Sequence, residues 1–200
     1  MDLPLHVSKT SEYCWIQIPK CASSTIRRVL NEHTTKDLHS HNEWEKIEYT
    51  EQHAELFTFI FVRNPFDRLV SCYYDKIVCH ERWSNIKRQS DSIHYMIDNK
   101  FNFHQFIEKI TTDFYGTDDH WMNCTNFIPK NHKNNMFIGK CENLQSDFNY
   151  VCKKIKIPSF TLPSANKTNH KHYTEYYNNE TRKLVEEKYA DDLANFEYKF

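Results

Sequence analysis

Two short apolar runs, each followed closely by a helix-start signal, constrain the fold of this chain more than any other feature of its sequence. The first run, residues 13–18, is followed by Ser23 and Ser24, which suit the cap of a helix. The second run, residues 57–62, is apolar nearly throughout and leads into Asn64-Pro65, a cap residue followed by a first-turn proline. Strands without polar alternation are typical of parallel sheets covered on both faces. The pattern therefore predicts a three-layer α/β domain with a central parallel sheet flanked by helices.

Periodic segments elsewhere complete this single domain, which we expect to span residues 1–200. Apolar residues at helical spacing predict further helices, and one more short apolar run predicts a third strand. The helices are expected over residues 23–32, 65–77, 103–110, 142–154 and 174–193, and the strand over residues 136–138. The polar stretches 34–55 and 80–102 are expected to be largely irregular.

Composition excludes several classes of protein. Only 2 of the 200 residues are glycine, so the glycine-rich phosphate loop of ordinary ATPases and GTPases is absent. The 26 basic and 27 acidic residues nearly cancel, and no block of like charge occurs, so nucleic acid is not an expected partner. The seven cysteines form no CxxC pair, and their odd number favours free thiols over a closed disulfide framework.

The sequence also carries expectations about location. The longest apolar runs are far too short to span a bilayer, and the N-terminus lacks the basic and apolar regions of a signal peptide. We therefore expect a soluble, cytoplasmic protein without a membrane segment, and a location in the Golgi lumen only if the chain is a fragment. The sequence contains no signal for the oligomeric state.

Residues 18–26 lie between the first predicted strand and the first predicted helix, where α/β proteins bind phosphates through free backbone N–H groups and the positive end of the helix dipole. Lys20 adds a mobile cation, and Ala22 is small enough to let the backbone approach an anion. Three hydroxyl donors follow, from Ser23, Ser24 and Thr25. The segment therefore suits a phosphate site, although a plain helix start with serine caps and a surface lysine has the same sequence.

The second strand–turn–helix repeats this arrangement. Arg63 would lie at the carboxyl end of the strand, and Ser71 lies eight residues later, inside the predicted helix. A guanidinium and a hydroxyl so placed could hold one phosphate, the guanidinium in a bidentate fashion. The alternative is an arginine in a salt bridge at a strand end, with Ser71 buried against a neighbouring helix.

Taken together, segments 19–25 and 62–71 resemble the two segments by which sulfotransferases bind the donor 3′-phosphoadenosine 5′-phosphosulfate (PAPS). The first is similar to the loop that holds the 5′-phosphosulfate, and the second to the strand and helix that hold the 3′-phosphate. The resemblance is strongest to carbohydrate sulfotransferases, and it implies a P-loop-like fold, PAPS as co-substrate and no metal. The donor-binding residues that it implies are Lys20, Cys21, Ala22, Ser23, Ser24, Thr25, Arg63 and Ser71.

The resemblance continues to the end of the chain. Residues 119–121 (Asp-His-Trp) and 137–144 resemble elements of the same family, and so do residues 166–168 and the stretch from residue 181 to residue 200. The Cys-Ala pair in the predicted phosphate loop departs from the family pattern, and the expected absence of a membrane anchor is a second departure.

Sulfuryl transfer requires a base for the acceptor proton, and His41 is the best match for it. Histidine titrates near neutrality, and the His-x-His of residues 39–41 resembles the pair in the heparan-sulfate 2-O-sulfotransferase group, where the second histidine is the base. His39 would then support the acceptor. The rival bases are Glu43, Glu45 and His120. The chain has 12 histidines, so His41 could equally be a surface residue, or half of a metal site without further ligands.

These assignments predict a PAPS-dependent O-sulfotransferase that acts on a hydroxyl, most simply on a carbohydrate. Lys20 is the catalytic cation that would neutralise charge on the bridging oxygen of the leaving phosphate. His120 and Trp121 would line the acceptor side, because an aromatic face suits a sugar, although Trp121 could instead anchor its loop from the core. The alternatives are a small-molecule kinase on a related fold and a nucleotide-binding module without catalysis.

Overall fold

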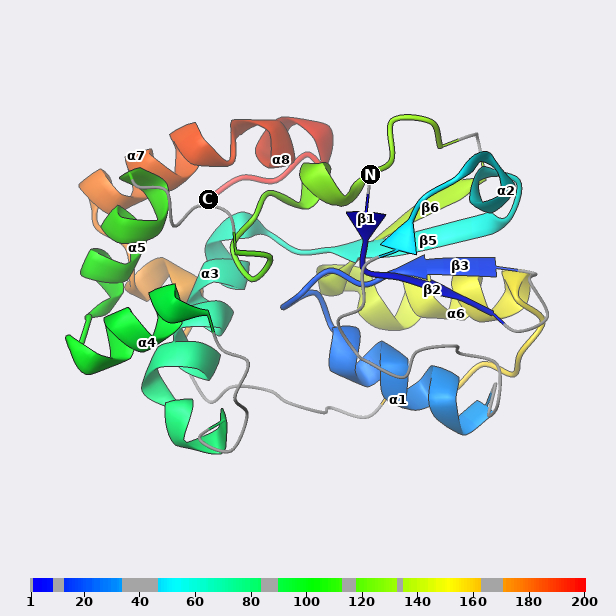
Figure 1. Cartoon of the computed structure of the whole chain (residues 1–200), viewed down its shortest axis with the longest axis horizontal. Coiled ribbons are helices and arrows are strands. Elements are labelled where there is room, and N and C mark those ends of the chain that lie inside the picture. The colour runs from blue at the N-terminus through cyan, green and yellow to red at the C-terminus, as the bar shows by residue number, and fades with distance from the viewer. Residues whose placement is uncertain are drawn as a thin grey trace. The chain divides into compact units, whose positions relative to one another are not determined.

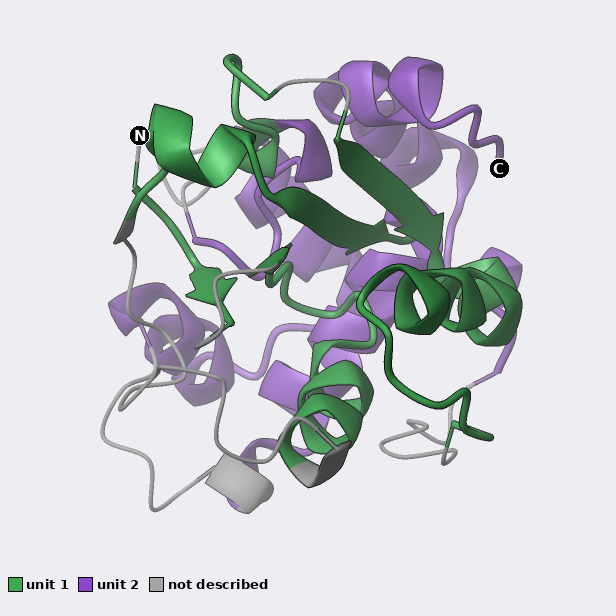
Figure 2. Cartoon of the chain, turned by 90° about the vertical axis from the view of Figure 1, so that its right-hand side faces the viewer, with its two compact units in different colours: residues 1–63, 126–167 green, residues 64–125, 168–200 purple. Residues whose placement is uncertain are grey.

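The structure is a computed structural model that describes residues 2–8, 13–33, 47–83, 90–112, 118–132, 135–162 and 171–200. The chain divides into two compact units (Figures 1 and 2). Unit 1 comprises residues 1–63 and 126–167, and unit 2 comprises residues 64–125 and 168–200. This division does not test the prediction of one domain over residues 1–200, because a single domain can hold two compact units.

Unit 1 is built on a four-stranded sheet in the order β2 (Leu5–Val7), β3 (Tyr13–Ile16), β5 (Phe57–Val62) and β6 (Met136–Lys140). Strands β3, β5 and β6 are parallel, as the apolar runs predict. Strand β2 pairs antiparallel with β3, so the predicted central parallel sheet has one antiparallel strand at its edge. A separate pair of short strands joins β1 (Asp2–Leu3) to β4 (Ile47–Glu48).

Helices α1 (Ser23–His33) and α6 (Leu144–Lys154) cover one face of the sheet (Figure 1). The guanidinium carbon of Arg27 on α1 lies 5.8 Å from the ring centroid of Trp15, and the Phe148 ring of α6 lies 6.3 Å from that of Phe61. Gly139 on β6 makes room for this packing, because a Cβ there would lie 2.5 Å from the Phe61 ring. A residue other than glycine would therefore require the Phe61 ring to shift.

The opposite face of the sheet is covered by the segment around the short helix α2 (Glu51–Ala54). Side chains alternate along a strand, so Thr58 faces away from Phe59 and Phe61. Its Oγ1 lies 3.4 Å from the hydroxyl of the buried Tyr49, and Ala54 of α2 is buried as well. Unit 1 thus has a sheet between two covering layers, which confirms the predicted three-layer α/β class.

Unit 2 is helical and begins with α3 (Pro65–Tyr73), which continues as the π-helix η1 (Tyr74–Val78). The predicted cap of α3 is confirmed, since Asn64 Oδ1 accepts a hydrogen bond from the Phe66 amide at 3.1 Å. The other helices of this unit are α4 (Asp91–Asp98), α5 (Phe103–Thr112), α7 (Asn179–Lys188) and α8 (Ala190–Asn195). They pack around a core that includes Phe66, Leu69, Phe106, Trp121 and Val185.

Several short elements complete the chain, and one expectation is wrong. Residues 80–102 are not irregular throughout, because α4 forms there around buried Ile93 and Met96. The short 3₁₀ helices are η2 (His80–Trp83), η4 (Cys124–Phe127), η5 (Cys141–Asn143) and η6 (Tyr173–Glu175). None of the seven cysteines, all of which lie in the described ranges, forms a disulfide bond. Within the described ranges, no helix has the length and apolar character needed to cross a membrane.

His6, on the edge strand β2, is a buried histidine that predicts how stability depends on pH. Its ring stacks on Trp15 at 4.9 Å between centroids, and its Nε2 lies 3.1 Å from Gln17 Oε1 and 3.2 Å from Arg27 Nη2. Burial and the Arg27 charge lower its pKa from 6.5 to about 4, against a smaller opposing effect of the Gln17 hydrogen bond. The folded state therefore resists protonation that the unfolded state accepts.

We expect this histidine to stabilise the fold fully above pH ~6.5 and to lose its contribution as the pH falls towards 4, by about 2 kcal/mol already at pH 5. Urea denaturation at pH 7 and pH 5 measures the difference. His6→Gln should remove most of this loss, whereas His172→Gln, which changes an exposed histidine, should retain it. An equal loss in His6→Gln would assign the acid sensitivity to other groups.

Candidate functional site

The loop that follows β3 adopts a backbone that glycine usually supplies. Lys20 and Ala22 both have left-handed φ angles, of 67° and 57°, and the Cys21 amide between them donates to the Ile18 carbonyl at 3.3 Å. Such angles cost non-glycine residues roughly 1–2 kcal/mol each. Backbones that alternate in this way direct successive N–H groups into an anion-binding concavity. The loop is therefore shaped for an anion although it lacks glycine.

Helix α1 starts directly after this loop and adds free backbone donors. Its first helical hydrogen bond runs from the Ile26 amide to the Ala22 carbonyl at 3.1 Å, so the amides of residues 23–25 precede the helical hydrogen bonds. The first turn contains no acidic residue that would neutralise the positive end of the dipole. Ser24 is exposed, Lys20 and Ser23 are half-buried, and Cys21 and Thr25 are buried. The residues present thus fit a phosphate-bearing group.

Arg63 lies at the end of β5 and contacts this loop. Its Nη1 donates to the Lys20 carbonyl at 3.3 Å. Because β3 and β5 are parallel neighbours, their carboxyl ends meet at one edge of the sheet. The structure therefore brings together Lys20 and Arg63, which the sequence assigned separately to the two donor segments.

Ser71 lies on α3, in unit 2, and is buried with 6% of its surface exposed. Its predicted share in binding the 3′-phosphate stays a prediction. The residue of this helix with the most evident structural role is instead Arg68, which sequence reasoning did not single out. Only 1% of Arg68 is exposed, so its guanidinium must find its partners inside the protein.

The partners of Arg68 are main-chain oxygens of the turn at residues 118–122, which we call the acidic turn. Its Nη1 donates to the Met122 carbonyl, and its Nη2 donates to the Asp119 carbonyl at 3.0 Å. A third carbonyl of the turn, that of Trp121, accepts a hydrogen bond from the buried Tyr189 hydroxyl. The acidic turn is thereby fixed to α3 and to the residue that follows α7.

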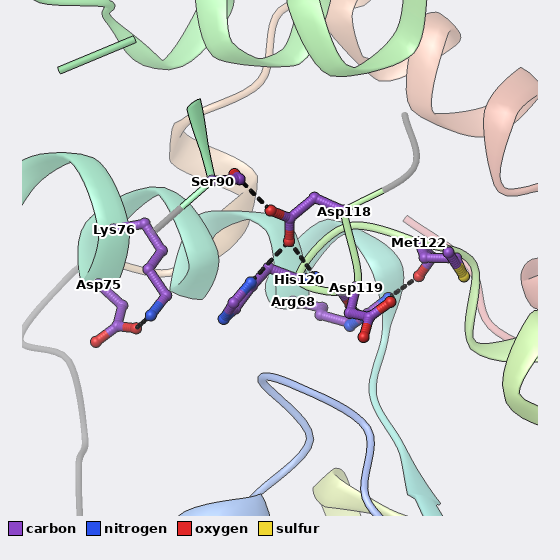
Figure 3. A network of polar contacts seen from close by, with 8 residues as sticks. All are labelled: Arg68, Asp75, Lys76, Ser90, Asp118, Asp119, His120 and Met122. Atoms are coloured by element: carbon purple, nitrogen blue, oxygen red, sulfur yellow. Dashed lines mark hydrogen bonds and ion pairs between the residues drawn. The ribbon is translucent and has the colours of Figure 1, made fainter. Parts of the chain in front are cut away.

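Asp118 begins the acidic turn and holds His120 (Figure 3). Asp118 Oδ1 accepts hydrogen bonds from His120 Nδ1 at 2.8 Å and from the His120 amide at 2.9 Å. Oδ2 accepts the Ser90 hydroxyl at 2.7 Å. Burial raises the pKa of Asp118, but the hydrogen bonds and charge of His120, with the Ser90 hydroxyl, outweigh burial and lower it to about 2. Asp118 is therefore ionised at neutral pH.

The other predicted residues of the acceptor side are either buried or outside the described residues. Trp121 is completely buried, and its ring packs edge-on against Phe106 at 6.0 Å between centroids. A buried ring fits a residue that anchors the acidic turn. It does not support the predicted contact of Trp121 with a sugar. The remaining candidates belong to the segment between α1 and β4 and lie outside the described residues. They are the candidate bases His41, Glu43 and Glu45 and the supporting residue His39. In the described part of the chain, no three His, Cys, Asp or Glu residues gather as a metal site would require.

Comparison with known proteins identifies the class of protein that this arrangement belongs to. The sulfotransferase family matches residues 4–199, and the chain therefore belongs to that family. It is similar to carbohydrate sulfotransferase 11 of Rattus norvegicus and of Mus musculus, each 24% identical over 234 residues. Those alignments cover 97% of this chain but 66% of each relative, so the chain spans just under two thirds of their length. The protein of the same name from Danio rerio is 24% identical over 78% of the chain. No solved structure gives a significant match.

Proposed function

We propose that the protein transfers a sulfuryl group from PAPS to a hydroxyl of a carbohydrate. The observation that carries this proposal is the contact of Arg63 with the Lys20 carbonyl, which joins the two predicted donor segments at one edge of the sheet. Membership of the sulfotransferase family supports sulfuryl transfer. The names of the similar proteins support a carbohydrate as acceptor.

The first donor segment would bind the phosphosulfate end of the donor. The amides of residues 23–25 and the Lys20 ammonium offer hydrogen bonds and positive charge to anionic oxygens. Arg63 would bind the 3′-phosphate, because its planar guanidinium fits phosphate oxygens in pairs. The helix dipole and the Lys20 ammonium would thus act on the phosphosulfate, and the Arg63 guanidinium on the 3′-phosphate.

The reaction needs three contributions from the protein. When bound, the donor supplies the sulfuryl group, whose bond to the 5′-phosphate oxygen breaks as the acceptor oxygen bonds to sulfur. Lys20 would stabilise the negative charge that the leaving phosphate oxygen gains. A base must take the acceptor proton. The resemblance assigns this step to His41 and the support of the acceptor to His39, whereas the rival base His120 is the candidate whose surroundings the structure describes. The remainder of catalysis is positioning, as in phosphoryl transfer.

Donor binding is tested by thermal-shift titration with adenosine 3′,5′-bisphosphate, run beside ATP and 5′-AMP. A ligand at ~100 times its Kd should stabilise the protein by about 2.7 kcal/mol. We expect this shift for the bisphosphate, and its loss in Arg63→Ala. Arg28→Ala, which changes an exposed arginine of α1, should keep it. An equal shift with ATP would favour a kinase, and no shift at all would refute a PAPS site.

Transfer itself is tested with radiolabelled PAPS and a panel of unsulfated polysaccharides. The proposal expects label on at least one polysaccharide. Bisphosphate binding without labelled product would leave a nucleotide-binding module without catalysis, and the enzymatic part of the proposal would then fail.

A further inference from the structure

We propose that His120 takes the proton of the acceptor hydroxyl, and that Asp118 is the positioning residue that holds His120 for this step. This inference rests on the proposed function and deepens it, because it names the base from the described geometry. The residues that carry it, Asp118, His120, Ser90, Arg68 and Tyr189, all belong to unit 2.

The first support is the way in which Asp118 fixes the imidazole. A carboxylate only accepts hydrogen bonds, so the 2.8 Å contact means that His120 Nδ1 carries a proton and donates it to Asp118 Oδ1. The same oxygen accepts the His120 amide, which sets the backbone of the residue as well as its ring. Ser90 fixes the other carboxylate oxygen. The tautomer and orientation of His120 are therefore determined by its neighbours.

A second support is the set of hydrogen bonds that holds the backbone of the acidic turn. Two buried side chains, Arg68 and Tyr189, donate to three of its carbonyls. Its own backbone adds hydrogen bonds from the Trp121 and Met122 amides to the Asp118 carbonyl, at 3.1 Å and 2.9 Å. A group that must meet a reacting atom is best placed on such a fixed support.

The proposed proton transfer follows from the hydrogen bond that His120 Nδ1 donates to Asp118. Since Asp118 holds that nitrogen, Nε2 is the ring atom that can take the acceptor proton. The acceptor O–H bond breaks as its proton moves to Nε2, the acceptor oxygen bonds to sulfur, and the bond from sulfur to the donor phosphate oxygen breaks. The imidazolium that forms is stabilised by the adjacent carboxylate and later releases its proton to water.

The immediate surroundings of His120 contain other charges that bear on its titration. Figure 3 shows Asp75 and Lys76 of η1, Arg68 of α3, and Asp119 of the acidic turn together with the Asp118–His120 pair. Lys76 Nζ lies 3.5 Å from Asp75 Oδ2, and 18% of the His120 side chain is exposed. The carboxylate in direct hydrogen-bond contact, Asp118, is therefore the charge whose removal should change the imidazole most.

The test compares steady-state sulfation of the polysaccharide that the wild type labels most. His120→Gln should lower kcat by about 10²- to 10⁴-fold and leave both the KM for PAPS and the bisphosphate thermal shift unchanged. His94→Gln, which changes an exposed histidine on α4, is the matched control and should keep wild-type kcat. His41→Gln is assayed beside them, and under this proposal it should lower kcat by less than His120→Gln.

The role of Asp118 has its own readout, because a purely structural residue would not move a titration. Asp118→Asn should lower kcat and shift the acid limb of kcat/KM to lower pH, since a neutral amide no longer stabilises the protonated imidazole. Ser90→Ala, which keeps the carboxylate, should leave that limb in place.

The outcomes separate the two proposals. If the wild type binds bisphosphate and sulfates a polysaccharide but His120→Gln keeps wild-type kcat, His120 is not the base and only this inference fails. If Asp118→Asn lowers kcat without moving the acid limb, Asp118 is a structural residue. If the wild type sulfates no member of the panel, the proposed function fails and this inference with it.

Discussion

Replacing Lys20 by alanine is expected to reduce kcat for sulfuryl transfer by about 10²- to 10³-fold. The proposed function assigns this ammonium to the negative charge that develops on the leaving phosphate oxygen, a contribution that is greatest in the transition state. The KM for PAPS should rise much less than kcat falls, because the amides of residues 23–25 and Arg63 would still bind the ground state. Initial rates with labelled PAPS measure both constants.

The loop geometry allows this substitution to remove the charge without changing the strain of the backbone. Lysine and alanine bear a similar cost for the φ angle of 67° at this position, so Lys20→Ala removes the charge without relaxing the backbone. Lys153→Ala, which changes an exposed lysine of α6, serves as the control and should retain wild-type rates. A kcat for Lys20→Ala within a factor of two of wild type would show that Lys20 has no catalytic role.

Replacing Asp192 by alanine is expected to destabilise the protein by roughly 3 kcal/mol, the largest stability effect that we predict. Only 1% of this residue on α8 is exposed. Its carboxylate accepts the Cys124 amide at 2.7 Å, the Thr125 amide at 2.8 Å and the Thr125 hydroxyl at 2.6 Å. Alanine would leave these donors without their acceptor at the end of the segment that carries the acidic turn.

Urea denaturation measures this loss, and the adjacent acidic residue offers a control. Asp191 is exposed on the same helix, so Asp191→Ala should change the free energy of unfolding by less than about 0.5 kcal/mol. Asp192→Asn should fall between the two, because the amide keeps one accepting oxygen. If both alanine variants unfolded at the same urea concentration, the buried hydrogen bonds of Asp192 would contribute nothing measurable.

The sequence predicts the frame of the proposed donor site because that frame depends on local signals. Apolar runs mark β3 and β5, and Asn64 followed by proline marks the start of α3. The contact of Arg63 with the loop after β3 also follows, since parallel neighbouring strands end at the same edge of the sheet. These inferences need no knowledge of side-chain packing.

Other features depend on tertiary contacts and have no local signal. The left-handed φ angles at Lys20 and Ala22 cannot be predicted from the sequence, because it lacks the glycine that normally indicates them. Arg68 has the sequence of a solvent-facing helical arginine, and only the fold shows that it is buried against backbone oxygens. The role of Asp118 is hidden for the same reason: its partner Ser90 is 28 residues distant in the chain.

The way in which the acidic turn is held has a consequence for how such an enzyme could acquire new acceptors. Arg68 and Tyr189 hold carbonyl oxygens, which every amino acid possesses, at Asp119, Trp121 and Met122. Substituting the side chain of Asp119 or Met122 therefore leaves these hydrogen bonds to the backbone in place. Mutation could vary the groups displayed beside His120 while their scaffold stays constant, so a change of specificity would not have to come at the expense of stability.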